Sequence, residues 1–262
     1  NSCEVIAFEI VIDGFVITIS SSCSSEANSI MLGDRLIRSG ALDRVVVGGT
    51  DALTEFTISG FRSLMIFDEE WCRPFDESRK GLNLGEGAGF IVIESAASIE
   101  KSGSTPIAQL KGWSNASDAY HQTASSPDGY GATLSISEAM KVAGLKPEDI
   151  DYINAHGTAT PNNDLSESKA IMHVFGDQVP PFSSTKAFTG HTLAAAAAIE
   201  AVYSVLALQH NLVFPNMNFK KPMEEFNLIP QTALKEKNIN HVLSNSFGFG
   251  GNCSTVIFSK SE

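Results

Sequence analysis

Cys23 is the first candidate for chemistry, because it lies where an apolar segment meets a helical pattern. The preceding residues, Phe15–Ile19, are apolar and largely β-branched, which predicts a buried strand. Free amides and the dipole at a helix start stabilise a thiolate, so we predict a nucleophile with a lowered pKa. A cysteine that only fills the core is the alternative. The helical pattern after Cys23 ends at Gly40 and contains Ala27, Ile30, Met31, Leu32, Leu36 and Ile37.

Two histidines follow segments that resemble the ends of structural elements. His156 comes directly after Ile150–Ala155, which reads as a buried strand, and His191 precedes an alanine-rich helical run. Strand and helix patterns alternate along the chain, which indicates a layered α/β fold. Such folds place their sites at the ends of strands, and Cys23, His156 and His191 all lie at strand ends or helix starts. Each histidine taken alone is more often a structural residue.

The composition narrows the class of protein. The chain has 262 residues, 43% of them hydrophobic, and a formal net charge of -12 with no basic stripe, which argues against nucleic acid as a partner. An acidic partner would need a local basic patch. No N-terminal targeting signal is visible, and the apolar run Leu193–Leu208, which contains Glu200, fits a buried helix better than a membrane span. The chain has four cysteines: Cys3, Cys23, Cys72 and Cys253. They are too few and too scattered for a disulfide framework or a zinc site, and they favour a reducing cytoplasm.

The glycine-rich run Gly81–Gly89 has a nucleotide-binding alternative. A phosphate loop follows a strand and opens a helix, whereas these glycines precede the apolar segment Phe90–Ile93, which reads as a strand. Close packing of backbones is therefore the favoured interpretation.

Five motifs in a fixed order carry a resemblance to a known family: ITISSSCSS, GLNLGEGAGFIVIES, NAHGTATPNND, SSTKAFTGH and NSFGFGGN. With them the sequence resembles the elongating (type I/II) β-ketoacyl-acyl carrier protein synthases of the thiolase-like superfamily, over essentially its whole length. The resemblance implies a layered α-β-α-β-α architecture built of two thiolase-like halves. Residues 1–110 would carry the nucleophile, and residues 111–262 the two histidines and a gating loop. The family's strands and helices that precede the cysteine strand are not found here, so the N-terminal half is expected to be incomplete.

The resemblance also implies roles for individual catalytic residues. Cys23 would hold the acyl chain as a thioester, while His156 and His191 stabilise the enolate formed on decarboxylation. Lys186 and Glu167 would support the histidines. Asp164, in the same network, is grouped with the substrate-binding residues.

A second set of implied roles concerns the substrate. The backbone amides of Cys23 and Phe249 would form an oxyanion hole, and Phe249 would act as a gate. Phe247, on the same loop, is assigned to substrate binding. Thr158 and Thr160 would bind the phosphopantetheine arm.

The implied reaction is a decarboxylative Claisen condensation of an enzyme-bound acyl thioester with malonyl-acyl carrier protein in fatty acid elongation. The products would be a 3-oxoacyl-acyl carrier protein and carbon dioxide. We expect no cofactor and no metal on this chain, since the phosphopantetheine arrives on the carrier protein. The expected assembly is a cytoplasmic homodimer without nucleic-acid or membrane partners.

Two alternatives remain. The first is a ketosynthase of polyketide or aryl-polyene synthesis, with the same chemistry. The second is a non-catalytic fragment or partner subunit that binds carrier protein. His191 favours the decarboxylating enzymes, because the chain-starting relatives resemble a Cys–His–Asn set. Ala194 and Ala197 replace glycines that are usual in the family.

Overall fold

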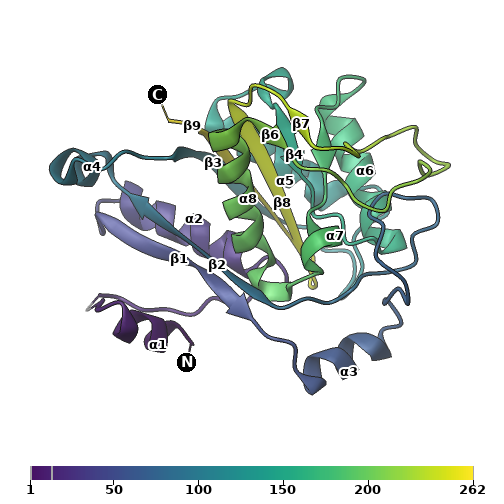
Figure 1. Cartoon of the computed structure of the whole chain (residues 1–262), viewed down its shortest axis with the longest axis horizontal. Helices are drawn as coiled ribbons and strands as arrows, with labels where there is room; N and C mark the ends of the chain where they lie inside the picture. The colour runs from purple at the N-terminus through teal and green to yellow at the C-terminus, as the bar shows by residue number, and fades with distance from the viewer. Residues whose placement is uncertain (1, 13, 262) are drawn as a thin grey trace.

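The computed structural model describes residues 2–12 and 14–261, and most of them belong to two β-sheets with helices between and beside them (Figure 1). The larger sheet is five-stranded, with the order β3-β9-β8-β4-β5. Strand β4 is parallel to both of its neighbours, whereas β3, β9 and β8 are antiparallel. The strands of the larger sheet are β3 (Ala108–Ser117), β4 (Tyr152–Asn154), β5 (Phe182–Ser183), β8 (His241–Gly248) and β9 (Asn252–Lys260).

The second sheet consists of β1 (Arg44–Asp51) and β2 (Gly87–Glu94), which pair antiparallel. Helices α2 (Ser25–Arg38) and α8 (Ala196–His210) lie between the two sheets and contact each other. A short third sheet pairs β6 (Leu212–Val213) with β7 (Lys235–Glu236).

The other face of the five-stranded sheet is covered by α5 (Tyr130–Ala143) and α6 (Pro161–Phe175). Because side chains alternate along a strand, β8 and β9 serve two cores. Val242 and Phe258 pack with α2 and α8, whereas Leu243 and Ile257 pack with α5 and α6. The remaining helical elements are α1 (Ser2–Glu9), α3 (Glu55–Ser63), α4 (Ala96–Ser102), α7 (Lys186–Thr189) and the 3-10 turns Pro147–Asp149 and Leu193–Ala195.

The predicted buried helix after Leu193 is confirmed. Within the described residues, Leu193–His210 is long and apolar enough to span a membrane, yet 56% of it is buried inside the protein. Ala201 and Leu208 lie in the core between the two sheets, so this segment is a core helix. Ala197, one of the two alanines expected to replace glycines, lies in the same core.

The predicted strand Phe15–Ile19 is wrong. The segment forms no strand, and Phe15 and Ile17 are 63% and 51% exposed. A strand needs a neighbour that receives its hydrogen bonds, and the only described partner of β1 is β2. The apolar, β-branched residues of Phe15–Ile19 favour a strand, but no described strand pairs with the segment, so a strand does not form.

Candidate functional site

Cys23 lies in a tight turn at the start of α2. Hydroxyl groups fix this turn, since Ser24 Oγ donates to Ser21 O at 2.8 Å and Ser25 Oγ donates to Ser22 O at 2.6 Å. Ser22 has a positive φ of 55°. Gly248 packs closely on the turn, because a Cβ at Gly248 would lie 2.8 Å from Ser21 O and 3.3 Å from Cys23 N. Only a glycine lets the β8–β9 loop approach the cysteine in this way.

The predicted lowering of the Cys23 pKa is wrong. Burial raises the pKa of the thiol to about 11, against the opposing effects of the Lys186 charge and the backbone N–H groups of Phe249 and Cys23. The N–H of Cys23 itself and that of Phe249 in the β8–β9 turn act on the sulfur, but the loss of water outweighs them. Cys23 is therefore a neutral thiol at pH 7, and the backbone N–H groups of Cys23 and Phe249 lie close to its sulfur.

His156 and His191 lie together, as expected for a shared role. Their rings are 5.4 Å apart and nearly perpendicular, at 86°, and both side chains are buried. The backbone of His191 is held by the glycine-rich run, since its N–H donates to Asn83 O at 2.7 Å and its carbonyl accepts from Gly85 N at 3.1 Å. The packing interpretation of that run is confirmed, because a Cβ at Gly85 would lie 1.9 Å from Thr189 O.

Lys186 fixes the protonation of His156. Its ammonium group lies 3.3 Å from His156 Nδ1 and forms a buried ion pair with Glu200. An ammonium group can only donate, so Nδ1 accepts and the ring proton resides on Nε2. Burial lowers the pKa of His156 and His191 well below the usual range, and the Lys186 charge lowers both further. The site thus holds two neutral imidazoles, one of which presents an Nε2–H donor.

Glu167 and Asp164 support the site through the backbone. Glu167 accepts from the N–H groups of His156 and Gly157, each at 2.8 Å, and burial raises its pKa to about 7. Asp164 accepts from Phe75 N at 2.7 Å and from Ala159 N at 3.1 Å. Both carboxyl groups come from the first turns of α6, so this helix positions the residues that follow β4.

The remaining predicted residues lie on β8 and the turn that follows it, and on the segment between His156 and α6. Phe247 packs on His156 with ring centroids 5.6 Å apart, and Phe249 stacks on Phe61 of α3 at 5.9 Å. The hydroxyl groups of Thr158 and Thr160 lie 2.9 Å apart where α6 begins.

The comparisons with known proteins agree with this geometry. Residues 3–98 match the N-terminal domain of β-ketoacyl synthases, and residues 107–220 match the C-terminal domain. The chain belongs to the β-ketoacyl synthase family.

Two curated relatives and two solved structures illustrate the similarity. The chain is 40% identical over 252 residues to a 3-oxoacyl-[acyl-carrier-protein] synthase 2 of Staphylococcus aureus and 38% identical over 255 residues to one of Coxiella burnetii. These matches cover 92% and 93% of the chain, which spans 61% of the length of each relative. The ishigamide ketosynthase/chain length factor superposes with a TM-score of 0.94 at 33% identity, covering 99% of this chain and 64% of that one.

The second structure is a type II polyketide ketosynthase bound to its acyl-carrier protein and a hexaketide. It superposes with a TM-score of 0.94 at 30% identity and covers 100% of this chain and 67% of that one. The thiolase-like layered fold expected from the motifs is therefore confirmed.

Glu200 is a residue of this site that the motifs did not reveal. It is buried, forms the ion pair with Lys186, and has a pKa that burial raises and Lys186 opposes. The signal was present in the sequence, since a single carboxylate inside an alanine-rich core helix must have a partner. Sequence reasoning used Glu200 only as an interruption of an apolar run.

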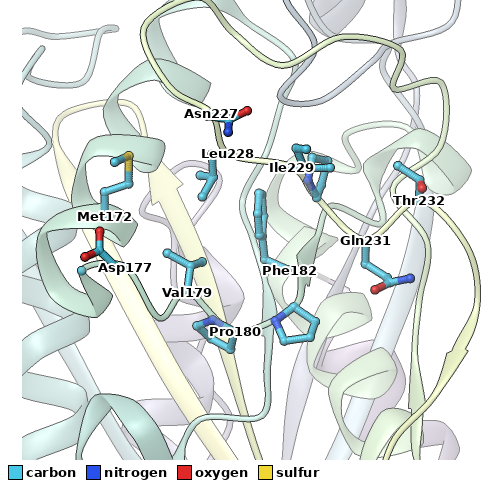
Figure 2. A pocket seen from close by; sticks show the side chains of 13 residues that line it. Met172, Asp177, Val179, Pro180, Phe182, Asn227, Leu228, Ile229, Gln231 and Thr232 are labelled. Carbon is cyan, nitrogen blue, oxygen red and sulfur yellow. The ribbon is translucent and has the colours of Figure 1, made fainter.

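A separate cavity of about 650 Å³ lies at the other end of α6. Figure 2 shows Met172 and Asp177 on one side of it, Gln231 and Thr232 on the other, and Phe182 between them. Because α6 has 15 residues, its two ends are about 22 Å apart. This cavity is therefore not part of the site at Cys23.

Proposed function

We propose that this chain carries the active site of a β-ketoacyl-acyl carrier protein synthase acting in fatty acid elongation. The supporting observation is that one buried ammonium group, that of Lys186, influences the pKa of three reactive side chains. Burial is the largest influence on the pKa of Cys23, His156 and His191, and the charge of Lys186 acts on all three. A thiol and two imidazoles around one cation fit thioester chemistry with a stabilised oxyanion.

In the first half-reaction, Cys23 Sγ attacks the acyl thioester of the carrier protein. The carbon–sulfur bond to Cys23 forms, the bond to the carrier thiol breaks, and the thiol proton passes to that leaving sulfur. Because one thiol replaces another, no net proton is released. The N–H groups of Cys23 and Phe249, which lie within reach of Sγ, are the donors we assign to the oxyanion of the tetrahedral intermediate.

In the second half-reaction, malonyl-carrier protein loses carbon dioxide and leaves an enolate. The Nε2–H of His156 and the neutral ring of His191 are the groups we assign to the enolate oxygen. The enolate carbon attacks the acyl group on Cys23, the carbon–sulfur bond breaks, and the released thiolate takes up one proton. Neutral imidazoles suit this step, because they donate hydrogen bonds without carrying a charge of their own into a buried site.

We also propose that the phosphopantetheine arm of the carrier protein passes Thr158 and Thr160, and that the protein acts as a cytoplasmic homodimer. The hydroxyl groups of Thr158 and Thr160 lie at the start of α6, shortly after His156 in the chain. All four cysteines are free thiols, which suits a reducing compartment.

Acyl transfer is tested by intact mass measurement after incubation with an acyl-carrier protein. One acyl group should appear on the protein and disappear in Cys23→Ala. Cys72→Ala, which changes another buried cysteine, should still be acylated. Acylation that survives in Cys23→Ala would overturn the assignment of the nucleophile.

Decarboxylation is tested by following acetyl-carrier protein formed from malonyl-carrier protein. His191→Asn should reduce the rate by about a hundredfold or more, the usual effect of losing one oxyanion donor. His173→Asn changes an exposed histidine on α6 and should leave the rate unchanged. If the chain forms no acyl-Cys23 and releases no carbon dioxide, the non-catalytic carrier-binding alternative replaces this proposal.

A further inference from the structure

The turn between β8 and β9 meets the segment that carries Cys23 on two sides. Gly248 and Asn252 are paired across the base of this turn. On one side of the base, a Cβ at Gly248 would lie 2.8 Å from Ser21 O and 2.9 Å from Ser24 Oγ, so the backbones are in direct contact. On the other side, Asn252 reaches the same segment through its side chain.

Donors from α2, its N-cap and β3 converge on the amide oxygen of Asn252. This oxygen lies 2.6 Å from Ser24 Oγ and 3.0 Å from both Asn28 Nδ2 and Asn115 Nδ2. The amide nitrogen of Asn252 donates to Asn115 Oδ1 at 3.0 Å. Asn115 Nδ2 also donates to Asn28 Oδ1 at 2.6 Å. Three asparagines and one serine therefore form a single hydrogen-bonded cluster.

Ser24 connects this cluster to the nucleophile, because it follows Cys23 in the chain and is fully buried. Its hydroxyl lies 2.6 Å from Asn252 Oδ1 and 2.8 Å from Ser21 O, so one proton is shared between these two acceptors. Asn28 adds a second connection, since its Nδ2 also donates to Ser21 Oγ at 2.7 Å. Residues on both sides of Cys23 are thus tied to the start of β9.

Further contacts hold the tip of the β8–β9 turn against other parts of the protein. The N–H of Gly250 donates to Gln122 O at 2.7 Å, and Phe249 stacks on Phe61 of α3 at 5.9 Å. These contacts orient the tip relative to residues 118–122 and α3. Its distance from the cysteine turn depends on the contacts at the base of the β8–β9 turn.

We propose that Asn252 is a positioning residue for the oxyanion donors of the acyl-transfer step. The two assigned donors, the N–H groups of Cys23 and Phe249, belong to different segments of the chain. Asn252 joins these segments, because it follows Phe249 by three residues and contacts Ser24, which adjoins Cys23. Donors that are fixed in advance lower the barrier most. The inference rests on the proposed function, since the donors have this role only if acyl transfer occurs at Cys23.

The test compares two reactions of Cys23 in the full 262-residue chain, only one of which forms an oxyanion. Acylation by an acyl-carrier protein passes through a tetrahedral intermediate, whereas alkylation by iodoacetamide displaces iodide directly. Asn252→Ala should lower the maximal acylation rate by about tenfold or more, with a half-saturating carrier concentration within about twofold of the wild type. Alkylation of Cys23, followed by peptide mass mapping, should stay within about twofold.

Asn211→Ala is the matched control for a loss of stability. Asn211 is half-buried like Asn252, and its amide oxygen accepts from Lys260 Nζ at 2.7 Å and from Ile239 N at 3.2 Å. It lies at the C-terminal end of α8, whereas His191 precedes the N-terminal end of that helix. Both reactions of Cys23 should therefore keep their wild-type rates in Asn211→Ala.

Ser24→Ala is a second variant, which removes only the donor at 2.6 Å. It should slow acylation and not alkylation, and it decides the question by the same comparison if Asn252→Ala does not fold. The double variant should be no more than about twofold slower than Asn252→Ala, because both changes remove one contact. Effects that multiply in the double variant, or alkylation slowed as much as acylation, would overturn the proposal.

The same measurements separate this proposal from the proposed function. If Cys23 of the wild type is not acylated, the proposed function fails and the role of Asn252 fails with it. If the wild type is acylated and Asn252→Ala is acylated at the same rate, only the role of Asn252 is overturned.

Discussion

Replacing Lys186 by Met separates the structural role of the buried ion pair from its role in the reaction. Lys186 and Glu200 are 2% and 3% exposed, so each is the counter-charge of the other in a region without water. Removing one partner of a buried pair leaves an uncompensated charge and typically costs about 3–5 kcal/mol. We therefore expect Lys186→Met to lower the free energy of unfolding by about that amount.

The double variant Lys186→Met/Glu200→Gln removes both charges and provides the control. Neutral replacements of similar size at a buried ion pair are often close to neutral for stability, so the double variant should be more stable than Lys186→Met alone by about 2 kcal/mol or more. The free energies come from urea unfolding of the wild type and of both variants, with Glu200→Gln closing the cycle.

Decarboxylation should nevertheless fail in both variants. Without the ammonium group, His156 Nδ1 loses its donor at 3.3 Å, and nothing then holds the ring proton on Nε2. Additive losses of stability in the cycle would refute the ion-pair reasoning. A double variant that decarboxylates at the wild-type rate would refute the role of Lys186 in fixing the His156 tautomer.

Two further predictions test single residues around the nucleophile helix. Burial raises the pKa of Glu26 from 4.5 to about 7, so its carboxyl group favours folding below pH 4.5 and this contribution is lost as the pH rises through 7. In urea unfolding, Glu26→Gln should stabilise the protein by up to about 3 kcal/mol at pH 8 and by little at pH 5. Glu100→Gln, which changes an exposed carboxyl group, is the control. Equal effects of Glu26→Gln at both pH values would contradict this reasoning. Gly248→Ala would place a Cβ 2.8 Å from Ser21 O, so it should lower the free energy of unfolding by about 1–3 kcal/mol and slow the acylation of Cys23. Gly60→Ala is the control, because a Cβ at Gly60 would have nothing within 4 Å. Equal acylation rates in the two alanine variants would show that the close approach of Gly248 does not matter.

Local patterns in the sequence located the candidate nucleophile, the two histidines and most helices. Cys23, His156 and His191 each follow or precede an element whose periodicity is visible within about ten residues, the range at which such patterns are informative. The motif resemblance then predicted that they meet, and the structure brings His156 and His191 to 5.4 Å. Strand pairing could not be predicted in this way, because it depends on residues far apart in the chain, as the failure of Phe15–Ile19 illustrates.

The sign of the Cys23 pKa shift also lay beyond local reasoning. A helix start contributes a modest stabilisation of negative charge, typically about 0.3–1 kcal/mol, while full burial shifts a pKa by several units. Which effect dominates depends on how completely segments that are distant in the sequence exclude water from the sulfur. The same holds for Glu200, whose partner is 14 residues away on another helix.

The charge state of the site follows from these contacts. Cys23 is a neutral thiol, and His156 and His191 are neutral imidazoles, because burial disfavours the ionised form of each. The only cation that acts on all three, among the residues described, is Lys186, and Glu200 pairs with it. At rest the reactive side chains of the site therefore carry no negative charge. In the proposed condensation Cys23 carries an acyl thioester when the enolate forms, so its sulfur bears no charge that could repel the enolate at that step.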